Sequence, residues 1–491
     1  MDNKKIKIVS IISIIALALT LVAATYAYFV AQTGEGAQTD IKINANTVDT
    51  FTFEAGSALN LSLNQENFAS GKGNQTGTTF AKAMLTANNK TNTATEHYYL
   101  YLNISENTFT YSVDNNTPEI LLSIKDGSNN EITTLTGLTY KTVTDGKGAS
   151  IKGFDITKKS GLITILNNRE ITTTSTKTEQ WNVTVTFVNY NSNQAGNAGK
   201  NFSAKLMIQK EKIPTVLSDV CTSGNNLSTC ITTLLNKSEP SIVNIYHHTS
   251  SLANGAGDNS YRYSGASDSV NNYICLGSDA ATCPDANLFR IMGVFGDQVK
   301  VIRAKSVGDQ KWHSSSLSNT WSSSSLNAYL NGTYLTSLGT LADKIATTTW
   351  KAGGGTEANI VTSVPKTAYQ YEVGSSASTT TVDKKIGLMY VSDYFYSASP
   401  SAWTLVGYNE SDATKDYRAA TSTNWLYLGS YEWTISCLSE STDYAFYVDS
   451  TGYVDLDLVT SSYAVRPSFN LLSSTTYVSG SGSMSDPVRV N

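Results

Sequence analysis

The feature that most constrains this chain is an uncharged apolar run at residues 8–30, which follows a lysine-rich start. A run of this length spans a hydrocarbon core of roughly 30 Å as one helix, and lysines before it place its N-terminal end in the cytoplasm. We therefore expect residues 1–36 to anchor the protein in the cell membrane as a single-pass segment, with the rest of the chain outside. A cleaved signal peptide is the alternative, because Thr25 and Ala27 stand at signal peptidase spacing and predict a secreted protein that begins at Tyr28.

Composition favours an exported protein with a polar surface. Charged residues make up 15% of the chain, and the formal net charge is −5. No basic surface for nucleic acid is therefore expected. Since 491 residues exceed what one hydrophobic core usually holds, we expect two folded domains.

The five cysteines predict two short disulfide loops and one remaining thiol. Cys221 and Cys230 are close in sequence, as are Cys275 and Cys283, and an exported chain meets oxidants. Free buried thiols or another pairing are the alternatives, because four cysteines permit three connectivities. Cys437 is left over, which predicts either a buried free thiol or an intermolecular bridge.

Residues 37–212 have the pattern of a β-sandwich. Apolar residues alternate in Leu100–Ile104, Ile120–Ile124 and Trp181–Phe187, and turns rich in Asn, Gly and Asp separate such runs. Many short strands with little helical periodicity favour an all-β sandwich. Pro214 follows the last strand, so a domain boundary is expected there.

Residues 213–272 change to a helical period. Leu227, Ile231 and Leu234 recur at helical spacing, which predicts a short helix. We interpret this part as a helical neck, followed by a crossing segment from Ser250 to Asp268 that is rich in Gly, Asn and Ser.

Residues 273–491 are expected to form an α+β head. A hairpin is predicted for Leu288–Phe295 and Gln298–Arg303, because Gly296-Asp297 supplies the positive φ that a two-residue turn can require. Two short helices follow, of which the first should stop at Asn331-Gly332. The helical pattern then continues over Thr333–Leu338 until Gly339 and restarts at Leu341–Ile345. Further strands are expected at Ile386–Val391, Tyr444–Val448, Tyr463–Phe469 and Val488–Val490.

Two stretches resemble known families. The segment Ala24-Thr25-Tyr26-Ala27-Tyr28-Phe29, followed by the β-sandwich pattern, resembles exported proteins of the TasA and camelysin type from Gram-positive bacteria. The second half resembles a domain of unknown function that is frequent in surface proteins of Firmicutes. The residues that carry this likeness are Asn287-Leu-Phe-Arg-Ile-Met-Gly-Val-Phe, Leu326-Asn-Ala-Tyr-Leu-Asn-Gly, Ile386-Gly-Leu-Met-Tyr-Val-Ser-Asp-Tyr and Ala464-Val-Arg-Pro-Ser-Phe-Asn-Leu.

That second resemblance implies a C-type-lectin-like fold, in the variety shared by formylglycine-generating enzymes and by ligand-binding surface proteins. The enzymes hold copper with a cysteine pair late in the chain, whereas here that part contains Cys437 alone. The resemblance therefore implies a cell-surface protein but no particular ligand, since a fold does not fix a function.

Catalytic and metal-binding motifs are missing from the sequence. It has no HExxH, GxSxG, phosphate-loop or EF-hand pattern, so we expect no enzyme, cofactor or metal site. Arg466, in an apolar strand, is expected to make an internal ion pair or carbonyl contacts. We expect five carboxylates to lie at the solvated surface, with a calcium site as the alternative. They are Asp393, Asp412, Asp416, Asp455 and Asp457.

The aromatic content of the head favours ligand binding. Tyrosines and tryptophans between Tyr390 and Tyr463 are interleaved with Ser, Asn and Gly, a mixture that binding loops use. We expect Trp425 and Trp433 in the core. The predicted ligand-binding residues, of which Tyr396, Trp403 and Tyr408 should be exposed, are Tyr394, Tyr396, Trp403, Tyr408 and Tyr417.

Together these features predict a bacterial cell-surface protein that presents an adhesion-type binding head on a β-sandwich stalk. Its partner would be an extracellular ligand, either a glycan or a host or bacterial surface protein. The alternative is a structural subunit of an extracellular fibre, built by strand addition at open sheet edges.

Overall fold

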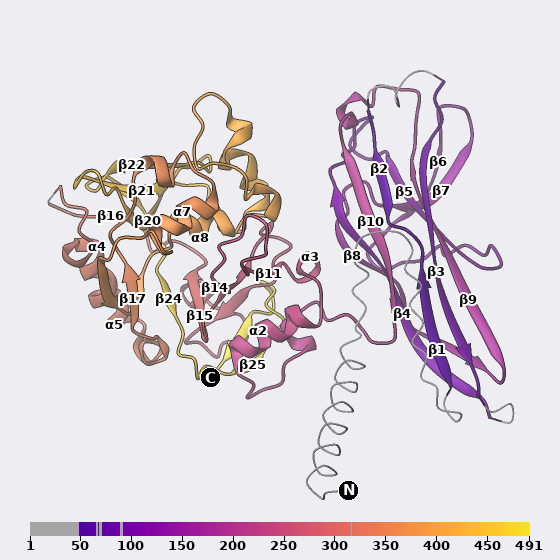
Figure 1. Ribbon diagram of the computed structural model, residues 1–491, viewed down its shortest axis with the longest axis horizontal. Coiled ribbons are helices and arrows are strands. Elements are labelled where there is room, and N and C mark those ends of the chain that lie inside the picture. The colour runs from indigo at the N-terminus through magenta and orange to yellow at the C-terminus, as the bar shows by residue number, and fades with distance from the viewer. Residues whose placement is uncertain (1–48, 65–66, 68–70, 89–91, 316) are drawn as a thin grey trace, which may run out of the picture. The chain divides into compact units, whose positions relative to one another are not determined.

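The computed structural model describes residues 49–491 except 65–66, 68–70, 89–91 and 316 (Figure 1). The chain divides into two compact units, Met1–Lys212 and Ile213–Asn491. The predicted membrane segment at residues 8–30 lies outside the described residues. Within the part that is described, no helix is long and apolar enough to cross a membrane.

The first unit consists of two antiparallel sheets that share a core, which agrees with the predicted all-β sandwich. The first sheet contains, in order across it, β1 (Thr50–Ala55), β3 (Gln75–Thr86), β9 (Thr176–Phe187), β5 (Ile120–Asp126), β7 (Ser150–Asp155) and β6 (Tyr140–Thr144). The second contains β2 (Leu59–Ser62), β10 (Asn201–Gln209), β4 (Ala94–Asn107) and β8 (Gly161–Thr173).

The alternation read from the sequence explains the core of this sandwich. Ile120, Leu122 and Ile124 on β5 are fully buried, as are Val183 and Val185 on the neighbouring strand β9. Because successive side chains of a strand point to opposite faces, one face of each strand supplies the core. The pattern of these runs therefore predicted the burial correctly.

The second unit is built on two larger sheets and a small one. The path of the nine-stranded sheet is β19 (Ile386–Gly387), β24 (Ser468–Asn470), β15 (Gln298–Arg303), β14 (Leu288–Phe295), β13 (Tyr273–Cys275), β26 (Val488–Val490) and β25 (Tyr477–Ser479). Strand β12 (Tyr261–Tyr263) also pairs with β14, and β11 (Ile245–His247) pairs with β12. The five-stranded sheet contains β16 (Asp309–Lys311), β23 (Ser462–Ala464), β20 (Glu432–Cys437), β21 (Tyr444–Val448) and β22 (Val454–Leu458). The small sheet pairs β17 (Thr348–Lys351) with β18 (Thr381–Lys384).

Short helices pack on these sheets. Leu227, Ile231 and Leu234 of α2 belong to the same hydrophobic core as Ile291 and Val301 on the hairpin strands β14 and β15. Residues 213–272 are therefore part of the second unit and do not form a separate neck. The helices are α2 (Leu227–Asn236), α3 (Pro240–Val243), α4 (Ser325–Tyr329), α5 (Leu335–Ser337), α6 (Glu357–Ile360), α7 (Pro365–Glu372) and α8 (Val391–Tyr396).

The predicted helix stop at Asn331-Gly332 is wrong. The chain continues from α4 through a π-helical turn, Leu330–Tyr334, into α5. The Asn331 side chain is used elsewhere: its Nδ2 donates to the Ile386 carbonyl at 2.8 Å, and its Oδ1 accepts from the Ile386 N–H at 3.0 Å. Asn331 thus ties the helix to β19 instead of ending it.

Two predicted strands are also shorter than expected. Of the segment Ile386–Val391, only Ile386–Gly387 (β19) pairs in a sheet, and Val391 begins helix α8. The segment Tyr463–Phe469 is split between β23 and β24, which belong to different sheets. The hairpin of β14 and β15 is confirmed, and Gly296 has the positive φ, 64°, that its turn requires.

The predicted cysteine pairing is confirmed. Disulfides join Cys221 to Cys230 and Cys275 to Cys283, with Cα atoms 5.7 and 5.8 Å apart. Cys437 is a buried free thiol. Both crosslinks lie in the second unit.

Candidate functional site

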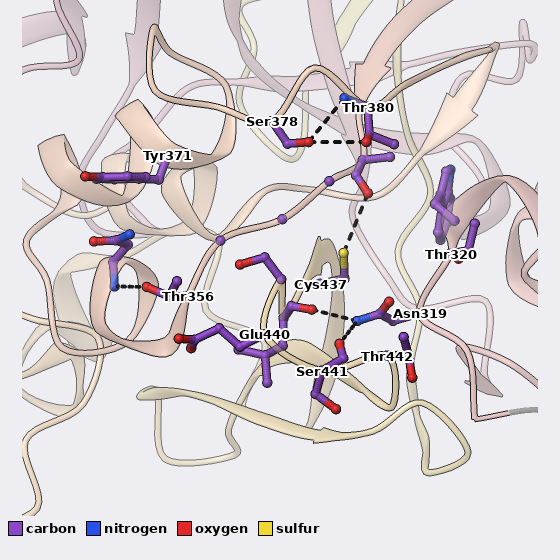
Figure 2. Close-up of a pocket in the computed structure, with 18 of the residues that line it drawn as sticks. Asn319, Thr320, Thr356, Tyr371, Ser378, Thr380, Cys437, Glu440, Ser441 and Thr442 are labelled. Atoms are coloured by element: carbon purple, nitrogen blue, oxygen red, sulfur yellow. Dashed lines mark hydrogen bonds between the residues drawn. The ribbon is translucent and has the colours of Figure 1, made fainter.

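The second unit contains a pocket of about 630 Å³, within the size range of small-molecule sites. Five segments that are distant in sequence form it, and Figure 2 shows their labelled side chains around Cys437. The segments are residues 319–322, the loop 352–356 between β17 and α6 with Asn359, Tyr371 on α7, residues 376–382 leading into β18, and residues 437–442 between β20 and β21.

The lining of this pocket is polar but nearly uncharged. Hydroxyl and amide side chains predominate, and of the lining residues, all of them described, Glu440 alone carries a charge. The polar side chains are Asn319, Thr320, Ser322, Thr356, Asn359, Ser376, Ser378, Thr380, Ser439, Ser441 and Thr442.

A glycine strap, residues 353–355, forms one wall by direct contact with the end of β20. The Gly355 N–H donates to the Cys437 carbonyl at 3.1 Å, and the Ser439 N–H donates to the Gly355 carbonyl at 2.9 Å. A Cβ atom at Gly354 would lie 1.7 Å from the Cys437 carbonyl oxygen, and its φ is +62°. This position therefore requires glycine for both space and backbone conformation.

Asn319 holds the opposite wall in place. Its Nδ2 donates to the carbonyls of Leu438, Ser441 and Tyr444 at 2.8 to 2.9 Å. Two of these bonds appear in Figure 2, where Asn319 points at the 438–442 loop. The Nδ2 donor is fully used in these bonds, so it shapes the pocket by fixing the loop.

Helix α7 presents Tyr371 to the pocket, where it is 37% exposed. The next residue, Glu372, is buried and fixes the helix: its carboxylate accepts from the N–H groups of Val391 at 2.9 Å and Ser392 at 2.7 Å, and from the Ser436 hydroxyl. Burial raises the pKa of Glu372 despite these donors. Tyr371 is thus held on a rigid support.

Several lining groups have no hydrogen-bond partner within the described chain. The side chains of Asn359, Tyr371, Ser376, Ser439 and Glu440 make no such bond there, and each is at least partly exposed. They remain available to a ligand as donors and acceptors.

Cys437 lies at the centre of the lining but is chemically inert. Its thiol donates to the Ala352 carbonyl at 3.6 Å, and burial raises its pKa to about 11. A thiol with such a pKa is neutral at physiological pH and is a poor nucleophile. The pocket therefore offers polar contacts rather than covalent chemistry.

The structure does not expose the aromatic residues predicted to bind a ligand. Tyr394, Tyr396, Trp403 and Tyr417 are each no more than 1% exposed, so the expected exposure of Tyr396 and Trp403 is wrong. Each ring has its polar atom bonded to a backbone carbonyl: Tyr394 to Gly452 at 2.8 Å, Tyr396 to Asn254 at 3.1 Å, Trp403 to Ala398 at 3.0 Å and Tyr417 to Phe395 at 2.9 Å. Only Tyr408 is partly exposed.

Trp403 is buried because segments much earlier in the chain cover it. Its ring packs edge-on against Tyr246 on β11, with centroids 5.5 Å apart, and lies 5.0 Å from the ring of His248. With Ala256, Tyr369 and Tyr396 it forms a small core of its own.

The predicted burial of Trp425 and Trp433 is confirmed, at 2% and 0% exposed. Arg466 makes the expected internal ion pair, with Glu432, at 2.6 and 2.7 Å. Burial raises the pKa of Glu432.

Two of the carboxylates expected at the surface are instead buried. Asp393 pairs with Lys300 and Arg262, and Asp416 pairs with Arg418 at 2.6 Å. Within the described chain, no group of three His, Cys, Asp or Glu side chains has the arrangement of a metal site.

Residues 296–473 match a family described as a domain of unknown function, DUF6273. The whole pocket lies within this matched segment, whereas the first unit lies outside it. No curated protein matches the chain.

Proposed function

We propose that this chain is a bacterial cell-surface binding protein whose second unit recognises a neutral, polyhydroxylated ligand such as a glycan in the pocket of residues 319–442. The main support for this proposal is the pocket lining, which contains hydroxyl, amide and carboxylate groups without a partner in the described chain and only one charged residue.

The chemistry of sugars suits such a lining. A sugar presents many hydroxyl groups, each able to donate and accept, and Ser439, Asn359 and Glu440 offer complementary partners. The exposed ring of Tyr371 provides a flat apolar surface on which a sugar face packs. An anionic ligand would lack a counter-ion, because Glu440 is the sole charged residue of the lining.

In this proposal residues 1–36 anchor the chain in the membrane or direct its secretion, and the first unit serves as a stalk. The second unit would be a binding head with a C-type-lectin-like fold. Loops on a rigid scaffold commonly carry binding residues, and the pocket is assembled from such loops.

Binding of the purified protein to a glycan panel, followed by titration calorimetry, tests this proposal. Tyr371→Ala and Ser439→Ala should each weaken binding about fivefold or more, because each removes a ligand contact but no internal bond. Val478→Ala is the matched control, since Val478 is 40% exposed and does not line the pocket. Binding of a glycan that is unchanged in both pocket variants would contradict the proposed site.

A fibre subunit remains the alternative function, and the open sheet edges of the first unit favour it. Strand β8 spans Gly161–Thr173 and pairs in its sheet with β4 alone. Electron microscopy of purified protein tests the alternative, which predicts long fibres without added ligand.

A further inference from the structure

One face of the five-stranded sheet carries an aromatic cluster that runs from the buried Trp433 to the exposed Tyr431. Trp433 on β20 and Tyr447 on β21 are cross-strand partners, so their side chains share this face. The ring of Tyr463 packs on both, with centroids 4.7 and 5.0 Å away, and Tyr431 stacks on Tyr463 at 5.2 Å with an interplanar angle of 22°. Tyr431 is the outermost ring, and it is 44% exposed.

Two carboxylates border this cluster. Asp455 on β22 is the cross-strand partner of Tyr447, and Asp457 accepts a hydrogen bond from the Tyr463 hydroxyl. No lysine or arginine of the described chain forms an ion pair with either carboxylate. Burial and the charges of Asp449 and Asp457 raise the pKa of Asp455. The face therefore holds negative charge that the described chain does not compensate.

An internal contact nearby shows how a cation fits such a surface. The guanidinium of Arg418 lies 5.0 Å from the ring of Tyr408 and 5.5 Å from that of Tyr453, and it pairs with Asp416 at 2.6 Å. The same combination of tyrosine rings with an adjacent carboxylate recurs around Tyr431, where the described residues supply no cation. An aromatic ring and a carboxylate together favour a guanidinium or ammonium group.

We propose that this face, defined by Tyr431, Tyr463, Asp455 and Asp457, docks a basic polypeptide segment through its Arg or Lys side chains. A cationic side chain stacks on the exposed ring of Tyr431, while Asp455 and Asp457 supply its counter-charge. The site is separate from the polar pocket, because none of these four residues lines that pocket. The chain's net charge of −5 favours approach of a basic partner as well.

The test measures binding of a fluorescently labelled hexa-arginine peptide to the purified full chain by anisotropy at low salt. Tyr431→Ala should weaken binding about fivefold, whereas Tyr431→Phe should retain it, because the ring and not the hydroxyl is exposed to the cation. Asp455→Asn should weaken binding to a similar extent. Asp297→Asn, at the exposed tip of the β14–β15 hairpin, makes the same change in net charge away from this face and should leave binding unaltered.

Three results would overturn the proposal: no binding of the peptide, equal losses for Asp455→Asn and Asp297→Asn, or unaltered binding by Tyr431→Ala. Equal losses would mean attraction by net charge alone. A neutral oligosaccharide that binds in place of the peptide and loses affinity with Tyr431→Ala would assign the face to sugar instead. Melting curves verify that each variant is folded, and Tyr431 and Asp455 are exposed enough for their replacement to be tolerated.

Discussion

At the scale of single residues, the burial of an aromatic side chain in the second unit depends on which segments cover it. The burial of Trp433 was predictable, because it lies on a strand in which apolar residues alternate with polar ones. That of Trp403 was not, because its neighbours in sequence are Ser, Pro and Thr and its cover comes from Tyr246 and His248. A loop that contains aromatic residues among Ser and Pro can therefore either bind a ligand or form a buried aromatic cluster.

Replacing Trp403 should therefore affect stability. We expect Trp403→Ala to cost about 3–5 kcal/mol of unfolding free energy, since it removes a fully buried ring and leaves a cavity. Chemical denaturation monitored by near-UV circular dichroism measures this loss. Tyr371→Ala, which alters an exposed ring, serves as the control and should cost less than about 1 kcal/mol. A Trp403→Ala protein as stable as the parent would place the ring outside the core.

His248, which packs on Trp403, should make stability depend on pH. Its Nδ1 accepts from the Ala256 N–H at 3.1 Å, and burial, aided by the charge of Arg262, lowers its pKa from 6.5 to about 2. The unfolded chain takes up a proton near pH 6.5 while the folded chain does not. Stability from this group is therefore complete above pH 6.5 and is lost as the pH falls.

We expect the contribution of His248 to the free energy of unfolding to fall by about 2–3 kcal/mol between pH 6.5 and 4.5. The slope is about 1.4 kcal/mol for each pH unit. Unfolding curves measured across this range check the slope. His248→Gln should flatten it, because glutamine still offers an acceptor to Ala256 but does not titrate. His247→Gln is the neighbouring control and should keep the parental slope.

At the scale of elements, regular segments were predictable and connections were not. The β14–β15 hairpin follows from two largely apolar segments joined by a Gly-Asp turn. The helix that continues through Asn331 does not, because that side chain is recruited by Ile386, more than fifty residues later in the chain. The pocket shares this property, because a glycine strap, a helix and three further segments form it and no local sequence motif predicts that they meet.

Replacing Gly354 tests the close contact between the glycine strap and the end of β20. Gly354→Ala should cost at least about 1–2 kcal/mol for the left-handed backbone conformation alone, and more for the contact with the Cys437 carbonyl. Denaturation measures the cost, and the pocket should lose its ligand because the strap must move. Gly332→Ala is the control, since a Cβ there meets no atom within 4 Å and the residue is helical. Equal stability of Gly354→Ala and the parent would contradict the close contact.

At the scale of the whole molecule, the boundary between the units was predictable from Pro214 and the change of period near residue 212. The packing of residues 213–272 into the second unit was not predictable. Apolar residues at helical spacing predict a helix, but they do not indicate which hydrophobic core the helix packs against. The hydrophobic clusters of the two units are distinct: Leu122 and Val185 belong to one, Ile231 and Val301 to another.

Because both disulfides lie in the second unit, a reductant should act on that unit alone. Each crosslink closes a short loop and contributes about 2–4 kcal/mol by restricting the unfolded chain. We expect dithiothreitol to lower the melting temperature of the transition assigned to residues 213–491 and to leave that of the sandwich unaltered. Differential scanning calorimetry with and without reductant separates the two. A shift of both transitions would contradict independent cores.

The position of β26 in its sheet has a consequence for how the protein is made. Val488–Val490 pairs in parallel with Tyr273–Cys275, and Arg489 donates to the carbonyls of Ser278 and Ala280 in the Cys275–Cys283 loop. These partners are synthesised more than two hundred residues earlier, so the large sheet stays incomplete until the ribosome has added residue 490. The sandwich has no such requirement and is free to fold first. Prematurely terminated chains would then carry a finished first unit joined to an unfinished second one, with an open sheet edge that favours aggregation.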